Sequence, residues 1–188
     1  MGGPGGTEVL RQAVAERTSV RVRPAGVEDL SGCAGIIAQE DLWRQYGVSR
    51  STALTLLRKA LGAGEPVLVA VRGGAVVGFV WFQLHGCFGR SGYVRWIATH
   101  PSVRNEGIGT ALLRAAEARI LRHGPNVFLL VSHVNRRAQR FYRGRGYERV
   151  GVLRDYVRRG VHEWIYRKTL GPLAPWRGEG GGKKARRR

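Results

Sequence analysis

The chain has 188 residues, 43% of them hydrophobic, and its 32 Lys and Arg against 13 Asp and Glu give a formal net charge of +19. This length and apolar content predict one folded domain and exclude a disordered chain. No apolar run is long enough to cross a membrane and the N-terminus has no apolar signal-peptide core, so we expect a soluble cytoplasmic protein. The two cysteines, Cys33 and Cys87, indicate neither a disulfide framework nor a metal site.

The basic excess attracts anions, including nucleic acid and acidic proteins. Because the arginines are scattered rather than striped, an arginine-rich composition of the source organism is the alternative explanation. Composition also divides the chain into three parts. We expect a flexible glycine-rich start over 1–18, with a helical turn or two within 8–17, a folded domain over 19–170, and a flexible basic tail over 171–188 for weak association with nucleic acid or acidic proteins.

Hydrophobic periodicity and turn residues predict a mixed α/β domain. Gly73-Gly74 is a hairpin signal between two apolar strands, and Ser49 is a favoured helix cap. The expected elements, in chain order, are a strand over 19–23, a helix over 27–39, an irregular link over 40–48, a helix from Ser49 to near 62–64, strands over 66–72, 75–84 and 92–99, a helix over 107–123, a strand over 127–131, a helix over 135–144, and strands over 147–155 and 162–169.

The junction between the strand at 92–99 and the following helix predicts an anion-binding loop. Arg104, Gly107 and Gly109 fit the pattern [RQ]-x-x-G-x-[GA] directly after an apolar strand. The first turn of a helix carries unpaired amide donors and a positive dipole end, and glycines let an anion approach the backbone closely. The Rossmann and P-loop patterns do not fit. An ordinary strand–turn–helix junction is the alternative.

A second apolar strand, at 127–131, leads into another pattern. Asn135, Ala138, Phe141, Tyr142 and Gly146-Tyr147 fit N-x-x-A-x-x-[FL]-Y-x-x-x-G-[FY]. In this order and spacing, the two stretches resemble the signatures of the GNAT superfamily of acetyl-CoA-dependent N-acyltransferases. The resemblance covers 19–170 and implies the GNAT fold, a mixed six- to seven-stranded sheet flanked by about four helices. Its central strands splay apart where the cofactor enters.

The resemblance further implies that an acetyl group passes from acetyl-CoA to a primary amine by direct attack in a ternary complex, without a metal. The amine belongs to a protein N-terminus, a lysine or a small molecule. Tyr142 is the implied general acid for the departing sulfur, with a core aromatic as the alternative, and Asn135 is also a favoured helix cap. The implied cofactor-binding residues are Ile97, Ala98, Thr99, Arg104, Asn105, Glu106, Gly107, Ile108, Gly109, Thr110, Asn135 and Tyr142.

The general base has no match in the sequence. Many relatives that acetylate protein N-termini carry a glutamate where this chain has Leu130. A water molecule is one candidate base, and the side-chain candidates, each with a surface or structural alternative, are Glu40, Asp41, His133, Asp155, His162 and Glu163. Arg154 and Tyr156 resemble the substrate-side loop of peptide and small-amine acetyltransferases. The aromatic candidates for walls of the acceptor site are Trp43, Tyr46, Trp81 and Trp96.

Two other functions stay open at this point. One is a GNAT-fold module that binds coenzyme A without catalysis, against which the intact Tyr142 argues. The other is a basic nucleic-acid-associated protein, although the sequence shows no recognised nucleic-acid motif with interleaved aromatic residues. A homodimer and the identity of the acceptor amine also stay open.

Overall fold

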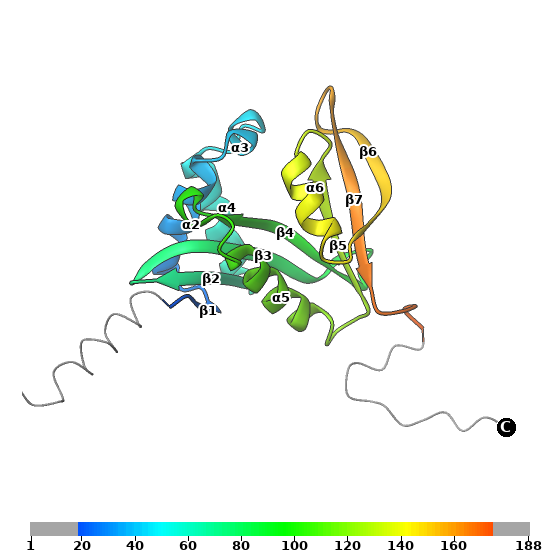
Figure 1. Ribbon diagram of the computed structural model, residues 1–188, viewed down its shortest axis with the longest axis horizontal. Helices are drawn as coiled ribbons and strands as arrows, with labels where there is room; N and C mark the ends of the chain where they lie inside the picture. Colours follow the sequence, from blue (N-terminus) through cyan, green and yellow to red (C-terminus); the bar gives the residue numbers. More distant parts are fainter. Residues whose placement is uncertain (1–18, 175–188) are drawn as a thin grey trace, which may run out of the picture. The chain divides into compact units, whose positions relative to one another are not determined.

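The computed structural model describes residues 19–174, so the predictions for 1–18 and 175–188 lie outside the described residues. Within this range the predicted order of strands and longer helices is confirmed, with two additional short elements, the helix α3 and the 3-10 helix η2 (Figure 1). The elements are β1 (Arg21–Pro24), η1 (Val27–Asp29), α2 (Leu30–Ala38), α3 (Asp41–Gln45), α4 (Arg50–Gly62), β2 (Val67–Arg72), β3 (Ala75–Cys87), β4 (Ser91–Thr99), η2 (Pro101–Val103), α5 (Ile108–Ile120), β5 (Asn126–Ser132), α6 (Arg136–Arg143), β6 (Glu148–Arg158) and β7 (Val161–Thr169).

Over the described residues the strands form a seven-stranded sheet in the order β1-β2-β3-β4-β5-β7-β6. The sheet is mixed, because β4 pairs with β5 in parallel while β5 with β7 and β7 with β6 are antiparallel. This confirms the predicted fold class. The parallel ladder of β4 and β5 runs only from Gly92↔Val127 to Val94↔Leu129, while both strands continue further. The central strands therefore share a short ladder, as the expected splay requires.

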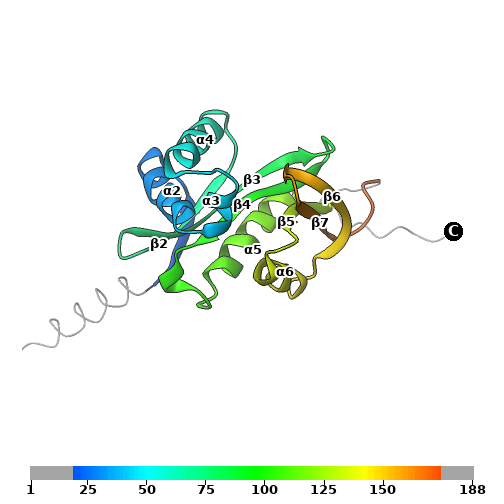
Figure 2. The same cartoon turned by 90° about the horizontal axis from the view of Figure 1, so that it is seen from above.

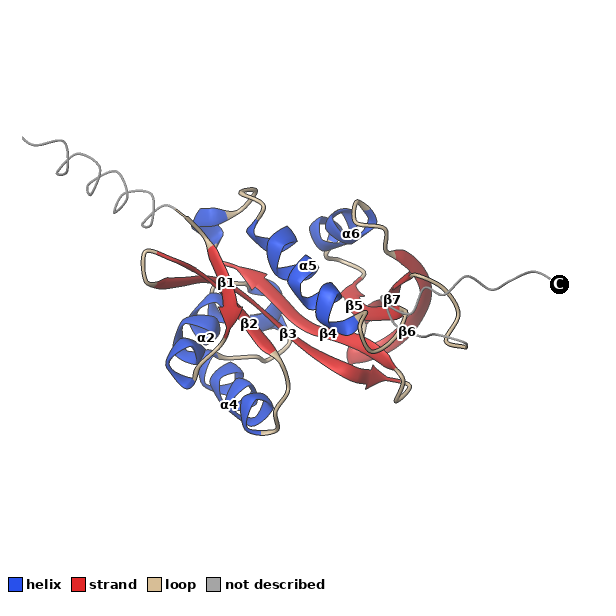
Figure 3. Cartoon of the chain, turned by 90° about the horizontal axis from the view of Figure 1, so that it is seen from below, coloured by secondary structure: helices blue, strands red, loops and turns tan. Residues whose placement is uncertain are grey.

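The chain divides into two compact units, and the described part of the first comprises residues 19–80 and 97–113. Its helices α2 and α4 lie side by side against β1 and β2 (Figure 3). Ser49 caps the start of α4 as predicted: its hydroxyl accepts a hydrogen bond from the Thr52 amide at 3.1 Å. The apolar stripes of the two helices face inward and include the fully buried Leu30, Ile37 and Leu57.

The described part of the second compact unit comprises residues 81–96 and 114–174. Its described part is built around β5, which pairs with β7 along its whole length, from Asn126↔Thr169 to Ser132↔Glu163. The helix α6 lies along β5 and β7 (Figures 1 and 2). Residues that alternate along β5, namely Val127, Leu129 and Val131, are buried, as expected for a strand covered by helices.

Several boundaries differ from those that the sequence predicts. The link at 40–48 is not wholly irregular, because Asp41–Gln45 forms the short helix α3. The strands β3 and β6 extend to Cys87 and Arg158, and α5 ends at Ile120 rather than near 123. Gly73 and Gly74 both have positive φ, at 54° and 80°, as the predicted tight hairpin turn requires. None of the described helices has the length and apolar composition needed to cross a membrane.

Candidate active site

The loop between β4 and α5 has the backbone conformation of an anion-binding loop. Asn105 and Gly107 have φ of 67° and 82°, and such left-handed residues within a turn direct successive amide groups toward one concave side. The first intrahelical hydrogen bond of α5 runs from the Ala111 amide to the Gly107 carbonyl at 3.0 Å, so the amides of the turn before Ala111 lack intrahelical acceptors. The loop lies between the buried anchors Val103 and Ile108. Residues 104–110, which the sequence predicts to bind an anion, therefore make up one loop and the first turn of α5.

Gly107 is required for its backbone conformation. A Cβ atom added there would meet no described atom within 4 Å, so lack of space is not the reason for a glycine at this position. A φ of 82° is instead strained for any residue with a side chain. Asn105 has the other positive φ, and asparagine tolerates the left-handed region better than most residues.

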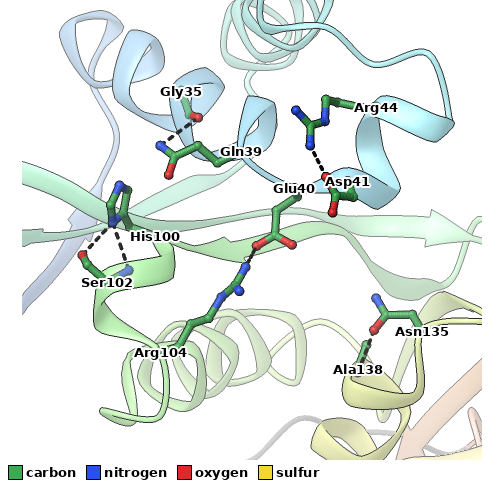
Figure 4. Close-up of polar contacts among 10 residues, drawn as sticks. All are labelled: Gly35, Gln39, Glu40, Asp41, Arg44, His100, Ser102, Arg104, Asn135 and Ala138. Atoms are coloured by element: carbon green, nitrogen blue, oxygen red, sulfur yellow. Dashed lines mark hydrogen bonds and ion pairs between the residues drawn. The ribbon is translucent and has the colours of Figure 1, made fainter.

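Two ion pairs fix this loop within the first unit. Glu106 accepts a hydrogen bond from Arg72 of β2 at 2.5 Å, and Arg104 pairs with Glu40, which immediately precedes α3. Figure 4 shows the Arg104 guanidinium directed at Glu40, and His100 beside Ser102, whose amide donates to His100 Nδ1 at 3.3 Å. The positive charge expected of Arg104 is therefore shared with a carboxylate, and Glu40, a candidate base, already has a cationic partner.

Helix α6 in the second unit begins as its motif predicts. The Asn135 side chain accepts a hydrogen bond from the Ala138 amide at 3.0 Å and so caps the helix. One turn later, buried Gln139 donates from Nε2 to the carbonyl oxygens of Ser132 and His133, at 3.1 and 2.8 Å. These bonds hold the start of α6 against the end of β5. The sequence reasoning missed Gln139, since the motif leaves its position unspecified.

Tyr142 is buried at the last turn of α6, with a relative exposure of 6%. Its ring lies among aromatic rings, with centroids 5.5 Å from Tyr147 and 6.4 Å from Tyr166. Burial raises the pKa of the Tyr142 hydroxyl, and the nearby Tyr93 adds to the rise. A phenol with a raised pKa stays protonated at neutral pH and can act as a hydrogen-bond and proton donor.

Most of the other candidate bases have structural partners. Asp41 pairs with Arg44 on the surface of α3. Asp155 accepts a hydrogen bond from the Gly160 amide at 2.7 Å in the turn between β6 and β7, and its carboxylate lies 3.5 Å from His162 Nδ1. His133 Nδ1 accepts a hydrogen bond from the His162 amide at 3.0 Å. Glu163 of β7 is buried in the sheet, with 4% exposure.

The aromatic candidates for the acceptor site divide by burial. Trp81 and Trp96 are buried and meet edge to face, with ring centroids 5.1 Å apart, which is a core arrangement. Arg95 lies over the Trp81 ring at 4.9 Å. Trp43 and Tyr46, in and after α3, are partly exposed, and Tyr156 of β6 is 62% exposed. Among residues 19–174, no group of three or more His, Cys, Asp and Glu side chains could hold a metal ion.

Comparison with protein families gives one match over most of the described chain. The sequence model of the Acetyltransferase (GNAT) family matches residues 37–147, which contain both motifs. Among curated proteins, mycothiol acetyltransferase from Brachybacterium faecium is 36% identical over 87 residues. That alignment covers 45% of this chain but only 26% of the length of the relative.

Solved structures have the same fold at low sequence identity. An N-acetyltransferase from Staphylococcus aureus Mu50 superposes with a TM-score of 0.68 at 17% identity, covering 82% of this chain and all of the other. PaiA N-acetyltransferase from Thermoplasma acidophilum, in complex with coenzyme A, gives 0.64 at 17% identity and covers 81% of this chain and 99% of its own. Similarity at this level of identity supports the fold alone.

Proposed function

Because the chain belongs to the GNAT acetyltransferase family, we propose that this acyltransferase moves an acetyl group from acetyl-CoA directly to a primary amine, with Tyr142 as the general acid. The observation that carries the proposal is the setting of Tyr142. It is a buried phenol, with its pKa raised chiefly by burial, on a helix whose start is fixed by Asn135 and Gln139. Such a group can protonate the thiolate that leaves when the amide forms.

We further propose that the loop of residues 104–110 binds the pyrophosphate of coenzyme A. Its support is the left-handed backbone at Asn105 and Gly107, directly before the positive end of α5. Main-chain donors supply this binding, because the Arg104 and Glu106 side chains already have ionic partners. Ile97, Ala98 and Thr99, at the end of β4, offer backbone groups to the pantetheine arm. The Asn135 side chain is the remaining contact with that arm.

The acceptor is proposed only as a class, a primary amine of a protein or a small molecule. The chain spans 26% of the curated relative's length, so the mycothiol chemistry in that protein's name belongs to that protein. A net charge of +19 favours an acidic or uncharged acceptor over a polycation. A cytoplasmic location and weak association of the basic tail with acidic partners complete the proposal.

Calorimetric titration with acetyl-CoA tests the cofactor, with ATP as the control polyanion and each titration repeated at high salt. We expect binding that is selective for acetyl-CoA and survives salt, because backbone hydrogen bonds in a shaped loop are screened less than surface charge. Binding that ATP matches, or that salt removes, would assign the attraction to the general basic field and refute the proposed site.

Acetyl transfer is then measured with three amines that differ in setting. These are an alanyl tetrapeptide with a free N-terminus, Nα-acetyl-lysine amide and phenylethylamine. Release of the coenzyme A thiol and the mass of the acetylated product are followed together, so that hydrolysis of acetyl-CoA is not mistaken for transfer. Wild-type protein that binds acetyl-CoA yet acetylates none of these amines would favour the non-catalytic binding module.

A further inference from the structure

Two histidines, His133 and His162, lie opposite each other where the pairing of β5 with β7 ends. The His133 amide donates to the His162 carbonyl at 2.9 Å, one step beyond the last ladder pair, Ser132 with Glu163. The two imidazole rings lie beside each other, with centroids 5.2 Å apart and planes 32° from parallel. Both residues are partly exposed, and His162 keeps 34% of its side-chain surface accessible. A ligand can therefore reach the pair.

The Nδ1 atom of each ring accepts a hydrogen bond from a main-chain amide. The donor to His133 Nδ1 is the His162 amide at 3.0 Å, and the donor to His162 Nδ1 is the Asp155 amide at 3.2 Å. A main-chain N–H can only donate, so the proton of a neutral ring lies on Nε2. The Asp155 carboxylate is 3.5 Å from His162 Nδ1, and a ring that is protonated there as well still carries its proton on Nε2. In both states each ring presents an Nε2–H donor.

The fold itself uses neither of these donors. Among residues 19–174, no group forms a hydrogen bond with Nε2 of either ring, because the polar contacts of both side chains run through Nδ1. The arrangement also argues against the general-base role that the sequence left open for both histidines, since the Nδ1 lone pair is engaged and Nε2 already carries a proton. Two N–H donors side by side instead suit a ligand with oxygen atoms that accept hydrogen bonds.

The pair lies beside the elements of the proposed site in the second unit. His133 directly follows β5 and comes two residues before Asn135, which caps α6 and is proposed to contact the pantetheine arm. Side chains alternate along β7, so His162 shares a face of the sheet with Tyr166. The Tyr166 ring is 6.4 Å from that of Tyr142 on α6. The two histidines are therefore on the face of β5 and β7 against which α6 packs.

The strand order favours the amine over the cofactor as the ligand. In the sheet, β5 has β4 on one edge and β7 on the other. The pantetheine arm is proposed to run along the end of β4, whereas the histidines join β5 to β7. Asp155, the hydrogen-bond partner of His162, is followed by Tyr156, which is 62% exposed. This edge of β5 is therefore available to the second substrate.

We propose that His133 and His162 bind a carbonyl or carboxylate group of the amine acceptor, each ring donating from Nε2. Successive Cα atoms of a peptide are about 3.8 Å apart, so a segment of two residues spans both rings. The inference rests on the proposed acetyl transfer and narrows its acceptor to amines that carry such a group, as peptide N-termini and amino acid derivatives do. A simple alkylamine has no oxygen to accept these hydrogen bonds.

His133→Asn and His162→Asn remove the proposed donor and keep the structural contact. Asn Oδ1 is as many bonds from Cα as His Nδ1, so it can accept the same main-chain hydrogen bond. Gln Nε2 is as many bonds from Cα as His Nε2, so His162→Gln keeps a donor and tests rescue. His123→Asn is the matched control, because His123 is an exposed histidine in the turn before β5, at the opposite end of that strand from His133.

Calorimetric titration of the protein saturated with coenzyme A measures acceptor binding without catalysis. The probes are the alanyl tetrapeptide, which carries carbonyl groups, and phenylethylamine, which carries none. We expect each Asn variant at His133 or His162 to bind the tetrapeptide about three- to tenfold more weakly, the typical effect of one hydrogen bond, and His162→Gln to recover part of the loss. Phenylethylamine and acetyl-CoA binding, and every affinity of His123→Asn, should stay within twofold of wild type. Thermal unfolding shows whether each variant is folded.

The results separate the binding site from the reaction. If folded His133→Asn and His162→Asn bind the tetrapeptide as His123→Asn does, the site assignment is wrong while the proposed acetyl transfer stands. If these two variants instead lose affinity for acetyl-CoA, the bound carbonyl belongs to the cofactor and the acceptor assignment is overturned. A wild type that binds the tetrapeptide no more tightly than phenylethylamine overturns it as well. If binding follows the expected pattern but no amine is acetylated, the proposed function fails and the pair stands as a peptide-binding site.

Discussion

Tyr142→Phe gives the sharpest test of the proposed chemistry, because it removes one oxygen and keeps the ring. The ring contacts with Phe141, Tyr147 and Tyr166, at centroid distances of 5.1, 5.5 and 6.4 Å, are available to phenylalanine as well. We therefore expect the free energy of unfolding to change by no more than about 1 kcal/mol, the typical net value of one hydrogen bond. Loss of a general acid should lower kcat by about 10²–10⁴-fold, or roughly 3–5 kcal/mol in the barrier.

The assay combines steady-state kinetics, acetyl-CoA calorimetry and denaturant unfolding on the same preparations. Tyr166→Phe is the matched control, since it removes the same atom from a buried neighbour in the same aromatic group. The acetyl-CoA Kd should be unchanged in both variants, because the hydroxyl acts on the leaving group. Since the Tyr142 pKa is raised above 10.0, the wild-type rate should show no alkaline loss from this residue below about pH 10. Equal kcat for the two variants would refute the general-acid assignment.

Three further predictions concern the loop, the folded state and the thiols. Gly107→Ala should weaken acetyl-CoA binding about 5–30-fold, because a side chain at this left-handed position costs about 1–2 kcal/mol. Gly64→Ala is the control for the calorimetric titration, since Gly64 has a φ of 73° and equally open surroundings, and this variant should bind acetyl-CoA normally. Asp29 accepts hydrogen bonds from Arg23 and the Gly26 amide, which lower its pKa, so Asp29→Asn should cost about 2–3 kcal/mol in urea unfolding at pH 7. That difference should shrink as pH falls below about 4 through the lowered pKa, and a pH-independent difference would contradict the ion pair. Cys33, fully buried with a pKa of about 12, should react with a disulfide reagent only on unfolding, and equal labelling rates for Cys33 and Cys87 in the native protein would refute this.

The sequence predicted those features of the fold that involve residues close together in the chain. The caps at Ser49 and Asn135 and the Gly73-Gly74 turn are confirmed, because a cap or a tight turn involves residues within a few positions of one another. The GNAT family and the mixed sheet are confirmed for the same reason, since both motifs are short and contiguous. The short helix α3 was missed because five residues carry little periodicity.

The polar interior of the candidate site could not be predicted in this way. Arg104 and Glu40 pair across 64 positions of sequence, and no pattern links them. Ser132 and Glu163 become neighbours only through the register of β5 against β7. Glu163 was one of six side-chain candidates in the sequence, and its burial follows from the strand pairing, which no local pattern predicts. The roles of the cofactor-binding residues and of Tyr142 stay predictions that the variants above test.

The short parallel ladder between β4 and β5 also bears on the order of folding. The hairpin of β6 and β7 closes through Arg159 and Gly160, whereas the β4–β5 ladder must close the connection through α5. Closing a longer connection costs more chain entropy, and three residue pairs recover less of it than the six pairs of β6 with β7. The β6–β7 hairpin should therefore form before the β4–β5 ladder during folding. In the native protein the β4–β5 ladder should open most easily, so amides along it should exchange faster than those of the longer antiparallel ladders.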